Sequence, residues 1–174
     1  MSNVFLISDL HLSHSNILTF LEPDGSNLRS FSSIQEHDEQ IIHNWNKVVT
    51  NNDKVYVLGD VCFKFAHLQA IIPRLNGYKN AVLIKGNHDE LKPSQYLQYF
   101  KDIRACSILD KFLLTHIPIH PDSLSRWKAN IHGHLHANVV KLTDGTPDKR
   151  YINVSCEQIN YTPIPFETIR GRYA

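Results

Sequence analysis

The chain has 174 residues, which is enough for a single domain with a sizeable core, and its 42% hydrophobic and 20% charged residues are typical of a globular protein. With 18 basic and 17 acidic residues, the formal charge is +1, so the excess of cations typical of strong nucleic-acid binding is missing. No apolar segment approaches the roughly 20 residues needed to cross a bilayer.

The N-terminus does not resemble a signal peptide, because the apolar run at residues 4–7 is short and no basic residue precedes it. Three cysteines, Cys62, Cys106 and Cys156, are far apart and form no CxxC pair. We therefore expect buried, reduced thiols in a cytoplasmic protein that has no membrane partner.

Short apolar runs alternate with helical patterns in the first half of the chain. Residues 4–8, 54–58 and 81–84 are apolar runs typical of buried strands. Ser33 and Glu36 have capping-box spacing and mark the start of a helix, whose apolar positions recur from residue 34 to residue 49. A second amphipathic helix is predicted over residues 65–75, where Asn76 and Gly77 end it.

The second half is predicted to be mostly strand. Pro93 is expected to open a short helix that runs to about residue 100, and strands are then predicted over residues 103–108, 111–115, 129–132 and 151–154. A βαβαβα order followed by strands predicts one α/β domain over residues 1–174, with a mixed sheet.

Five short motifs follow five of these strands. They are Asp9-Leu-His11, Gly59-Asp60, Gly86-Asn87-His88-Asp89, Thr115-His116 and Gly133-His134-Leu-His136. Ligands gather at the carboxyl ends of strands in α/β sheets, so these ends are expected to converge on one site. Each motif offers carboxylate, imidazole or amide atoms that bind metals, whereas any one motif alone is weak evidence.

In this order, the five motifs resemble the calcineurin-like metallophosphoesterases, and residues 29–60 further resemble small bacterial and phage members of that superfamily. The resemblance implies a four-layer αββα sandwich that carries two metal ions at its edge. It assigns Asp9, His11 and His136 to the first ion, Asn87, His116 and His134 to the second, and Asp60 to both. His88 would face the substrate.

Two ions about 3.5–4 Å apart can hold a phosphate between them and lower the pKa of a bridging water, whose hydroxide attacks phosphorus. The leaving group then needs a proton, and His88 is placed to supply it as general acid. Nitrogen and oxygen ligands without thiolate suit Mn²⁺, Fe, Zn²⁺ or Ni²⁺, of which family analogy favours Mn²⁺.

Four further residues have open roles. His14 and Arg29 lie in the loop that begins at the first motif, where each either binds substrate phosphate or lies on the surface. His132 is expected to be a core or supporting histidine. Asp89 either orients a neighbouring group or caps a helix.

The sequence therefore predicts a metal-dependent phosphoesterase whose substrate is a small phosphate ester, with a nucleotide as one candidate and a phosphodiester slightly favoured. The alternatives are a phosphomonoesterase or nucleotide phosphatase, a nuclease acting on long nucleic acid, and an inactive metal-binding scaffold. A scaffold would have no reason to keep His88, and a nuclease would want a basic groove. Strong nucleic-acid binding is not expected, and the oligomeric state stays open.

Overall fold

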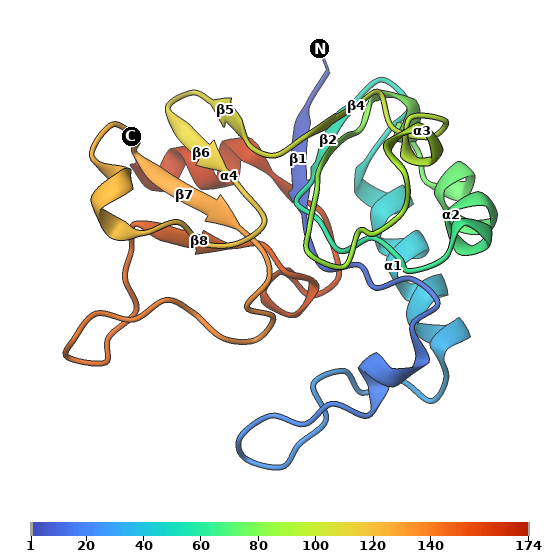
Figure 1. The fold of residues 1–174 in the computed structure, drawn as a ribbon, viewed down its shortest axis with the longest axis horizontal. Helices are drawn as coiled ribbons and strands as arrows, with labels where there is room; N and C mark the ends of the chain where they lie inside the picture. The colour runs from blue at the N-terminus through green and yellow to red at the C-terminus, as the bar shows by residue number, and fades with distance from the viewer. Residues whose placement is uncertain (1, 174) are drawn as a thin grey trace.

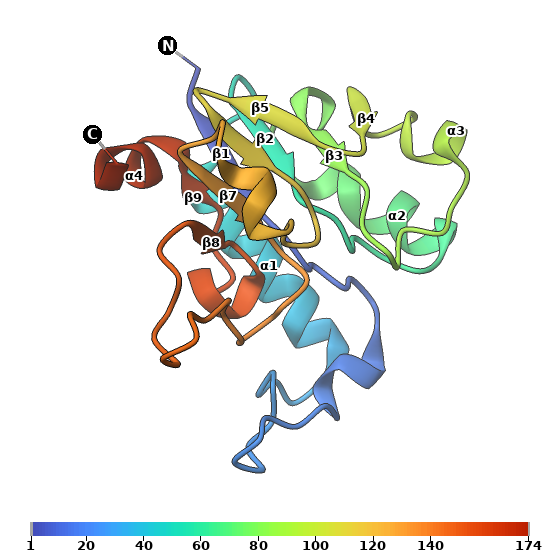
Figure 2. The same cartoon turned by 60° about the vertical axis from the view of Figure 1, so that its left-hand side comes forward.

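Two β-sheets lie face to face in the computed structural model, which describes residues 2–173 (Figures 1 and 2). Helices cover the outer face of the first sheet, and the two termini lie away from the long loop at residues 19–28, which projects from the opposite end. The α/β class with mixed sheets that the sequence predicts is confirmed.

The first sheet has five strands in the order β4-β3-β2-β1-β9. Strands β1 (Val4–Ile7), β2 (Lys54–Val57), β3 (Val82–Ile84) and β4 (Asp102–Arg104) run parallel, whereas β9 (Ile164–Pro165) pairs antiparallel with β1. Parallel strands covered on both faces need apolar residues at successive positions, which the first three strands supply.

The second sheet has four strands in the order β5-β6-β7-β8. Its strands β6 (Phe112–Leu114), β7 (Ala129–His132) and β8 (Tyr151–Asn153) are parallel, and β5 (Ser107–Leu109) pairs antiparallel with β6. The sheets join where Ser8, just after β1, forms a parallel bridge with Ser155, just after β8. This junction brings the carboxyl ends of both sheets to one edge.

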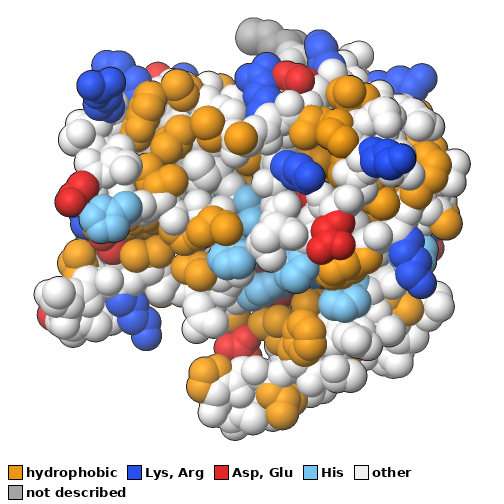
Figure 3. All heavy atoms as spheres, viewed as in Figure 1, with side chains coloured by type: hydrophobic (Ala, Val, Ile, Leu, Met, Phe, Trp, Pro, Cys, Tyr) orange, Lys and Arg blue, Asp and Glu red, His pale blue; other side chains and the backbone are white. Residues whose placement is uncertain are grey.

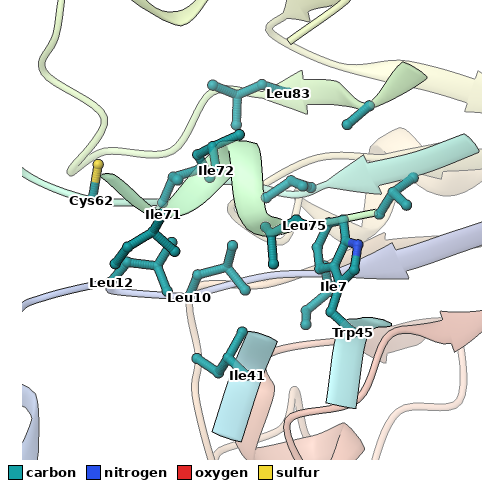
Figure 4. Close-up of a cluster of buried hydrophobic side chains, with 14 of the residues drawn as sticks. Ile7, Leu10, Leu12, Ile41, Trp45, Cys62, Ile71, Ile72, Leu75 and Leu83 are labelled. Carbon is teal, nitrogen blue, oxygen red and sulfur yellow. The ribbon is translucent and has the colours of Figure 1, made fainter. Parts of the chain in front are cut away.

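Alternate residues of the first sheet divide between two apolar cores. Phe5 and Ile7 face the helices α1 (Ile34–Val48) and α2 (Phe65–Ile71), and Leu6 faces the second sheet. Figure 4 shows Ile41 and Trp45 of α1 directed at the chain around β1. The Ser33 hydroxyl accepts a hydrogen bond from the Glu36 amide at 3.1 Å, which confirms the predicted start of α1.

The outermost layer, beyond the second sheet, is formed by residues 117–128 with the 3₁₀ turn Pro121–Leu124. The Asn130 amide oxygen accepts a hydrogen bond from the Ile119 amide, and the Tyr151 hydroxyl donates one to the Ile119 carbonyl. The helix α4 (Phe166–Arg170) instead packs at the end of the core between the sheets.

Some predicted elements are wrong in extent. The strand expected over residues 103–108 is two strands, β4 and β5, because the chain crosses between the sheets at residues 105–106. The helix α3 (Pro93–Tyr96) ends earlier than expected, and α2 gives way to a 3₁₀ turn that contains Pro73. Neither β9 nor α4 was predicted. Across residues 2–173, no helix is long and apolar enough to span a membrane.

Candidate metal centre

The five motifs follow strands β1, β2, β3, β6 and β7, and all five lie at the shared carboxyl edge of the two sheets. Backbone hydrogen bonds tie the segments that leave these strands to one another. The Asp9 amide donates to the Gly59 carbonyl at 3.0 Å, and the His11 amide donates to the Asp60 carbonyl at 3.0 Å. The convergence that the sequence predicts is thereby observed.

Five of the motif residues adopt the left-handed backbone conformation, which residues other than glycine rarely adopt. They are Asp9, His11, Asp60, His134 and His136, with φ between 46° and 68°. Each such residue costs on the order of 1 kcal/mol or more, and strain of this kind concentrates at functional sites. Here the left-handed conformation turns the backbone sharply after each strand and directs the side chain toward the shared edge.

Gly133 permits a close approach between the first and last motifs. A β-carbon there would lie 1.9 Å from the Ser8 hydroxyl oxygen and 2.4 Å from a carboxylate oxygen of Asp9. Ser8 and Asp9 already occupy the space that a side chain would need, so only glycine fits at this position.

Asp9, His11 and His136 form the first of two clusters whose ligand atoms lie within 4.8 Å of one another. The Asp9 Oδ2 atom accepts hydrogen bonds from the His134 amide at 2.9 Å and the Ser155 hydroxyl at 2.8 Å. Its Oδ1 atom lies 3.9 Å from His136 Nε2. One carboxylate oxygen is therefore fixed by the protein while the other faces the cluster.

Asp60, His116 and His134 form the second cluster. The Asp60 Oδ2 atom lies 3.3 Å from His116 Nε2 and 3.7 Å from His11 Nε2, so it faces ligand atoms of both clusters. Asn87 joins this side, since its Oδ1 atom lies 2.9 Å from His116 Nε2. All seven predicted ligands are thus brought together, and the Asp60 carboxylate lies between the two groups.

Unpartnered buried atoms show that the first cluster suits a cation. Among the described residues, Asp9 Oδ1 and both ring nitrogens of His11 are buried without a hydrogen-bond partner. Burial, with the nearby charge of Arg29, lowers the pKa of His11 to about 2, so its ring is neutral and keeps a lone pair for a ligand. Buried polar atoms without partners are costly, and a bound metal ion would satisfy them.

Three hydrogen-bond acceptors face one another in the second cluster. His116 Nδ1 donates to the Leu58 carbonyl at 2.7 Å, which leaves Nε2 of a neutral ring facing oxygens of Asn87 and Asp60. Burial opposes protonation of His116, but its hydrogen bond with Asp60 outweighs this and raises its pKa. A proton or a metal ion is required among these atoms. The two clusters could therefore each hold a metal ion.

His88 lies beside the clusters and belongs to neither. Its backbone amide donates to Asp60 Oδ1 at 2.9 Å, and its exposed ring lies 5.8 Å from that of His11 and 5.2 Å from that of Phe63. His14 lies on the same side, 4.5 Å from Phe63 and 5.7 Å from His11 between ring centroids. Phe63 was not predicted as part of the site.

Both roles left open for Arg29, a contact with substrate phosphate and a position on the surface, are wrong. Its side chain is completely buried, and the guanidinium donates to the backbone carbonyls of Asp9 at 2.6 Å and Leu10 at 3.2 Å. It also pairs with Glu157 at 2.8 Å and lies 2.8 Å from His37 Nε2. All of these partners lie in the interior, so Arg29 supports the backbone of the first motif.

Asp89 orients neighbouring loops and caps no helix. Its buried carboxylate accepts hydrogen bonds from the backbone amides of Asp60, Val61 and Gly86.

His132 is a core histidine, completely buried, whose Nδ1 lies 2.7 Å from the Gly133 carbonyl. Of the three cysteines, Cys62 and Cys156 are buried as expected, whereas Cys106 is exposed.

Glu157 is a supporting residue that the motifs did not indicate. It lies just after β8, and its Oε1 atom is 3.0 Å from His136 Nδ1. Burial opposes its ionisation, but the hydrogen bond with His136 and the charge of Arg29 outweigh this and lower its pKa to about 2. A weak signal was present in the sequence, because an acid follows a predicted strand here as Asp9 and Asp60 do in the first two motifs.

Hollows flank the centre on two sides. One, of about 470 Å³, is lined by His134, His136 and the apolar residues Leu21, Leu28 and Leu135. The other, of about 340 Å³, is lined by residues that include Asn87 and His116. Figure 3 shows several histidines gathered at the hollowed part of the surface above the projecting loop.

Comparisons with known proteins place the chain in a family. No protein-family model matches it. It is 25% identical over 185 residues to the gene 66 protein of a Mycobacterium phage, covering 88% of each chain. The crystal structure of AQ665, a protein of unknown function from Aquifex aeolicus, superposes with a TM-score of 0.73 at 25% identity, covering 99% of this chain and 100% of that one.

The uncharacterized protein MJ1445 of Methanocaldococcus jannaschii is 35% identical over 173 residues, covering 97% of this chain and 90% of that protein. Identity at this level over nearly the full length of both proteins shows common descent. The chain therefore belongs to the family of MJ1445.

Proposed function

We propose that the protein is a metal-dependent phosphoesterase of the calcineurin-like metallophosphoesterase superfamily, with a phosphodiester as the favoured substrate. The observation that carries this proposal is the pair of His/Asp clusters on either side of Asp60, whose Oδ2 atom faces ligand atoms of both. A carboxylate shared in this way offsets the charge of two neighbouring cations, and a centre with two ions suits the hydrolysis of phosphate esters.

In this proposal Asp9, His11 and His136 hold one ion, Asn87, His116 and His134 hold the other, and Asp60 contacts both. When bound, two divalent ions supply Lewis acidity toward phosphoryl oxygens and lower the pKa of water between them. Mn²⁺ is the favoured metal, since nitrogen and oxygen donors without thiolate suit Mn²⁺, Fe, Zn²⁺ or Ni²⁺.

His88 is the proposed general acid. Its ring is exposed beside the clusters, and its backbone is fixed by the hydrogen bond to Asp60 Oδ1. An imidazolium ring is a proton donor, so His88 can deliver a proton to the oxygen of the departing alcohol. His14, on the same side, is a further proposed contact for the substrate phosphate.

The flanking hollows favour a diester over a monoester, because a phosphodiester carries two organic substituents and space is present on both sides of the centre. A small substrate, with a nucleotide as one candidate, fits this arrangement better than long nucleic acid, given a formal charge of only +1. An inactive scaffold has no use for the exposed His88 beside a complete ligand set.

A hydrolysis screen of the full-length protein tests the proposal. Protein loaded with Mn²⁺ is compared with chelator-treated protein on bis-p-nitrophenyl phosphate, p-nitrophenyl phosphate and a panel of cyclic and linear nucleotides. We expect hydrolysis that depends on the metal and is faster on the diester. Hydrolysis of the monoester alone would replace the diester assignment with a phosphatase. Absence of hydrolysis across the panel with both sites filled would favour the scaffold.

A further inference from the structure

A buried ion pair connects the first and last of the five motifs from behind the site. Arg29 Nε and Glu157 Oε1 lie 2.8 Å apart, although 128 residues separate them in the chain. Both side chains are almost completely excluded from solvent, at 0% and 6% exposure. An ion pair placed in the interior needs a structural or functional reason, because burial of charge costs free energy that the pairing only partly returns.

Each end of this pair holds a different part of the first cluster. The guanidinium of Arg29 donates to the carbonyls of Asp9 and Leu10, which fixes the backbone of the first motif in its left-handed turn. The carboxylate of Glu157 accepts from His136 Nδ1 at 3.0 Å, so His136 Nε2 points toward Asp9. One ion pair therefore sets the relative positions of Asp9 and His136.

The histidines of the second cluster have no charged partner of this kind. Its buried histidine, His116, donates Nδ1 to the neutral backbone carbonyl of Leu58. For the side chain of His134, no hydrogen bond to another residue is found among residues 2–173. A carboxylate behind a histidine ligand raises its basicity and fixes its orientation, which a backbone carbonyl does less strongly. The two clusters thus differ in the charge placed beside their histidine ligands.

We infer that Glu157, held by Arg29, is a positioning residue that makes the Asp9, His11 and His136 cluster the tighter of two metal sites. The inference rests on the proposed function, since it assumes two ions. Glu157 acts in two ways. It orients His136, and its negative charge offsets the buried Arg29 charge, which would otherwise repel an ion at this cluster.

Calorimetric titration of metal-free, full-length protein with Mn²⁺ alone tests the inference without any measurement of turnover. The wild type should bind two ions in two resolved steps. Glu157→Gln keeps a hydrogen-bond acceptor for His136 but removes the charge, and it should weaken the tighter step by about 10–100-fold while the weaker step is unchanged. Glu157→Ala removes both contributions and should weaken the tighter step further.

The matched control is Glu39→Gln. Glu39 also pairs with an arginine, Arg74 at 2.7 Å, but on the surface, where the two side chains are 58% and 46% exposed. Both binding steps should be unchanged in this variant. If Glu157→Ala fails to fold, Glu157→Gln decides the question, with its melting temperature as the check on folding.

The outcomes separate the inference from the proposed function. Unchanged binding in Glu157→Gln, or equal weakening of both steps, would overturn the positioning role while two ions remain bound by the wild type. A wild type that binds no Mn²⁺ would contradict the proposed function itself. Electron paramagnetic resonance adds a second readout, since free Mn²⁺ gives a strong signal that broadens when the ion is bound. When one equivalent of Mn²⁺ is added, more of the free-ion signal should remain with Glu157→Gln than with the wild type.

Discussion

The carboxylate of Asp89 accepts a hydrogen bond from the backbone amide of Asp60 at 2.9 Å and thereby joins the loops that follow β2 and β3. The same carboxylate also accepts from the amides of Val61 and Gly86 and from the Tyr96 hydroxyl. An asparagine side chain has an NH₂ group in place of one carboxylate oxygen. That group would face N–H and O–H donors and could not accept hydrogen bonds from them. We expect Asp89→Asn to lower the free energy of unfolding by about 3 kcal/mol.

Urea denaturation of the metal-free protein measures this effect, and Glu90→Gln is the matched control because Glu90 is the exposed neighbour of Asp89. A destabilisation no larger than that of the control would contradict the role assigned to Asp89.

His88→Ala should separate catalysis from metal binding. The exposed ring belongs to neither cluster, so the variant should retain its metals and melting temperature while kcat falls by about 10²–10⁴. The loss should be larger for a nucleotide than for a p-nitrophenyl ester, because p-nitrophenolate leaves without a proton. Steady-state kinetics on both substrates checks this.

An equal loss on both substrates would instead assign His88 to charge stabilisation on the phosphoryl oxygens. Loss of a metal ion from His88→Ala would mean that His88 is a ligand.

The buried carboxylate of Asp53 should make stability depend on pH. It accepts hydrogen bonds from the Asn3 amide at 2.7 Å and from the amide and hydroxyl of Thr50. Burial opposes ionisation, but these bonds outweigh it and hold the pKa of Asp53 below its ordinary value. Its contribution to stability is therefore present above the ordinary pKa and is lost as the pH falls through the lower, folded-state value.

At pH 7 we accordingly expect Asp53→Asn to be less stable than the wild type, with a difference that shrinks as the pH falls below about 4. Urea denaturation at a series of pH values measures the difference. A difference that stays constant down to the acid limit would show that the pKa of Asp53 is not lowered by folding.

Local signals explain which parts of the fold the sequence predicts. The start of α1 follows from Ser33 and Glu36, which interact within one turn, and β1 to β3 follow from apolar runs covered on both faces. The crossing at residues 105–106 leaves no such signal, because β4 and β5 are too short to show a pattern of their own. The two residues of β9 are likewise too few for a pattern.

The site shows the same division. The grouping of the seven candidate ligands was predictable because each follows a strand and the order of motifs resembles a known superfamily. The buried position of Arg29 could not be predicted. An arginine is buried only where it has partners such as Glu157, and spacing along the chain does not indicate a partner so distant. Glu157 itself was missed because a single acid shortly after a predicted strand forms no motif on its own.

Metal content with anomalous scattering tests the central claim most directly. Protein reconstituted with Mn²⁺ is crystallised, and anomalous difference maps are calculated from data collected near the manganese edge. The account predicts two peaks per chain, one among Asp9, His11 and His136 and one among Asn87, His116 and His134, with Asp60 in contact with both. A single ion, or ions bound at other residues, would contradict it.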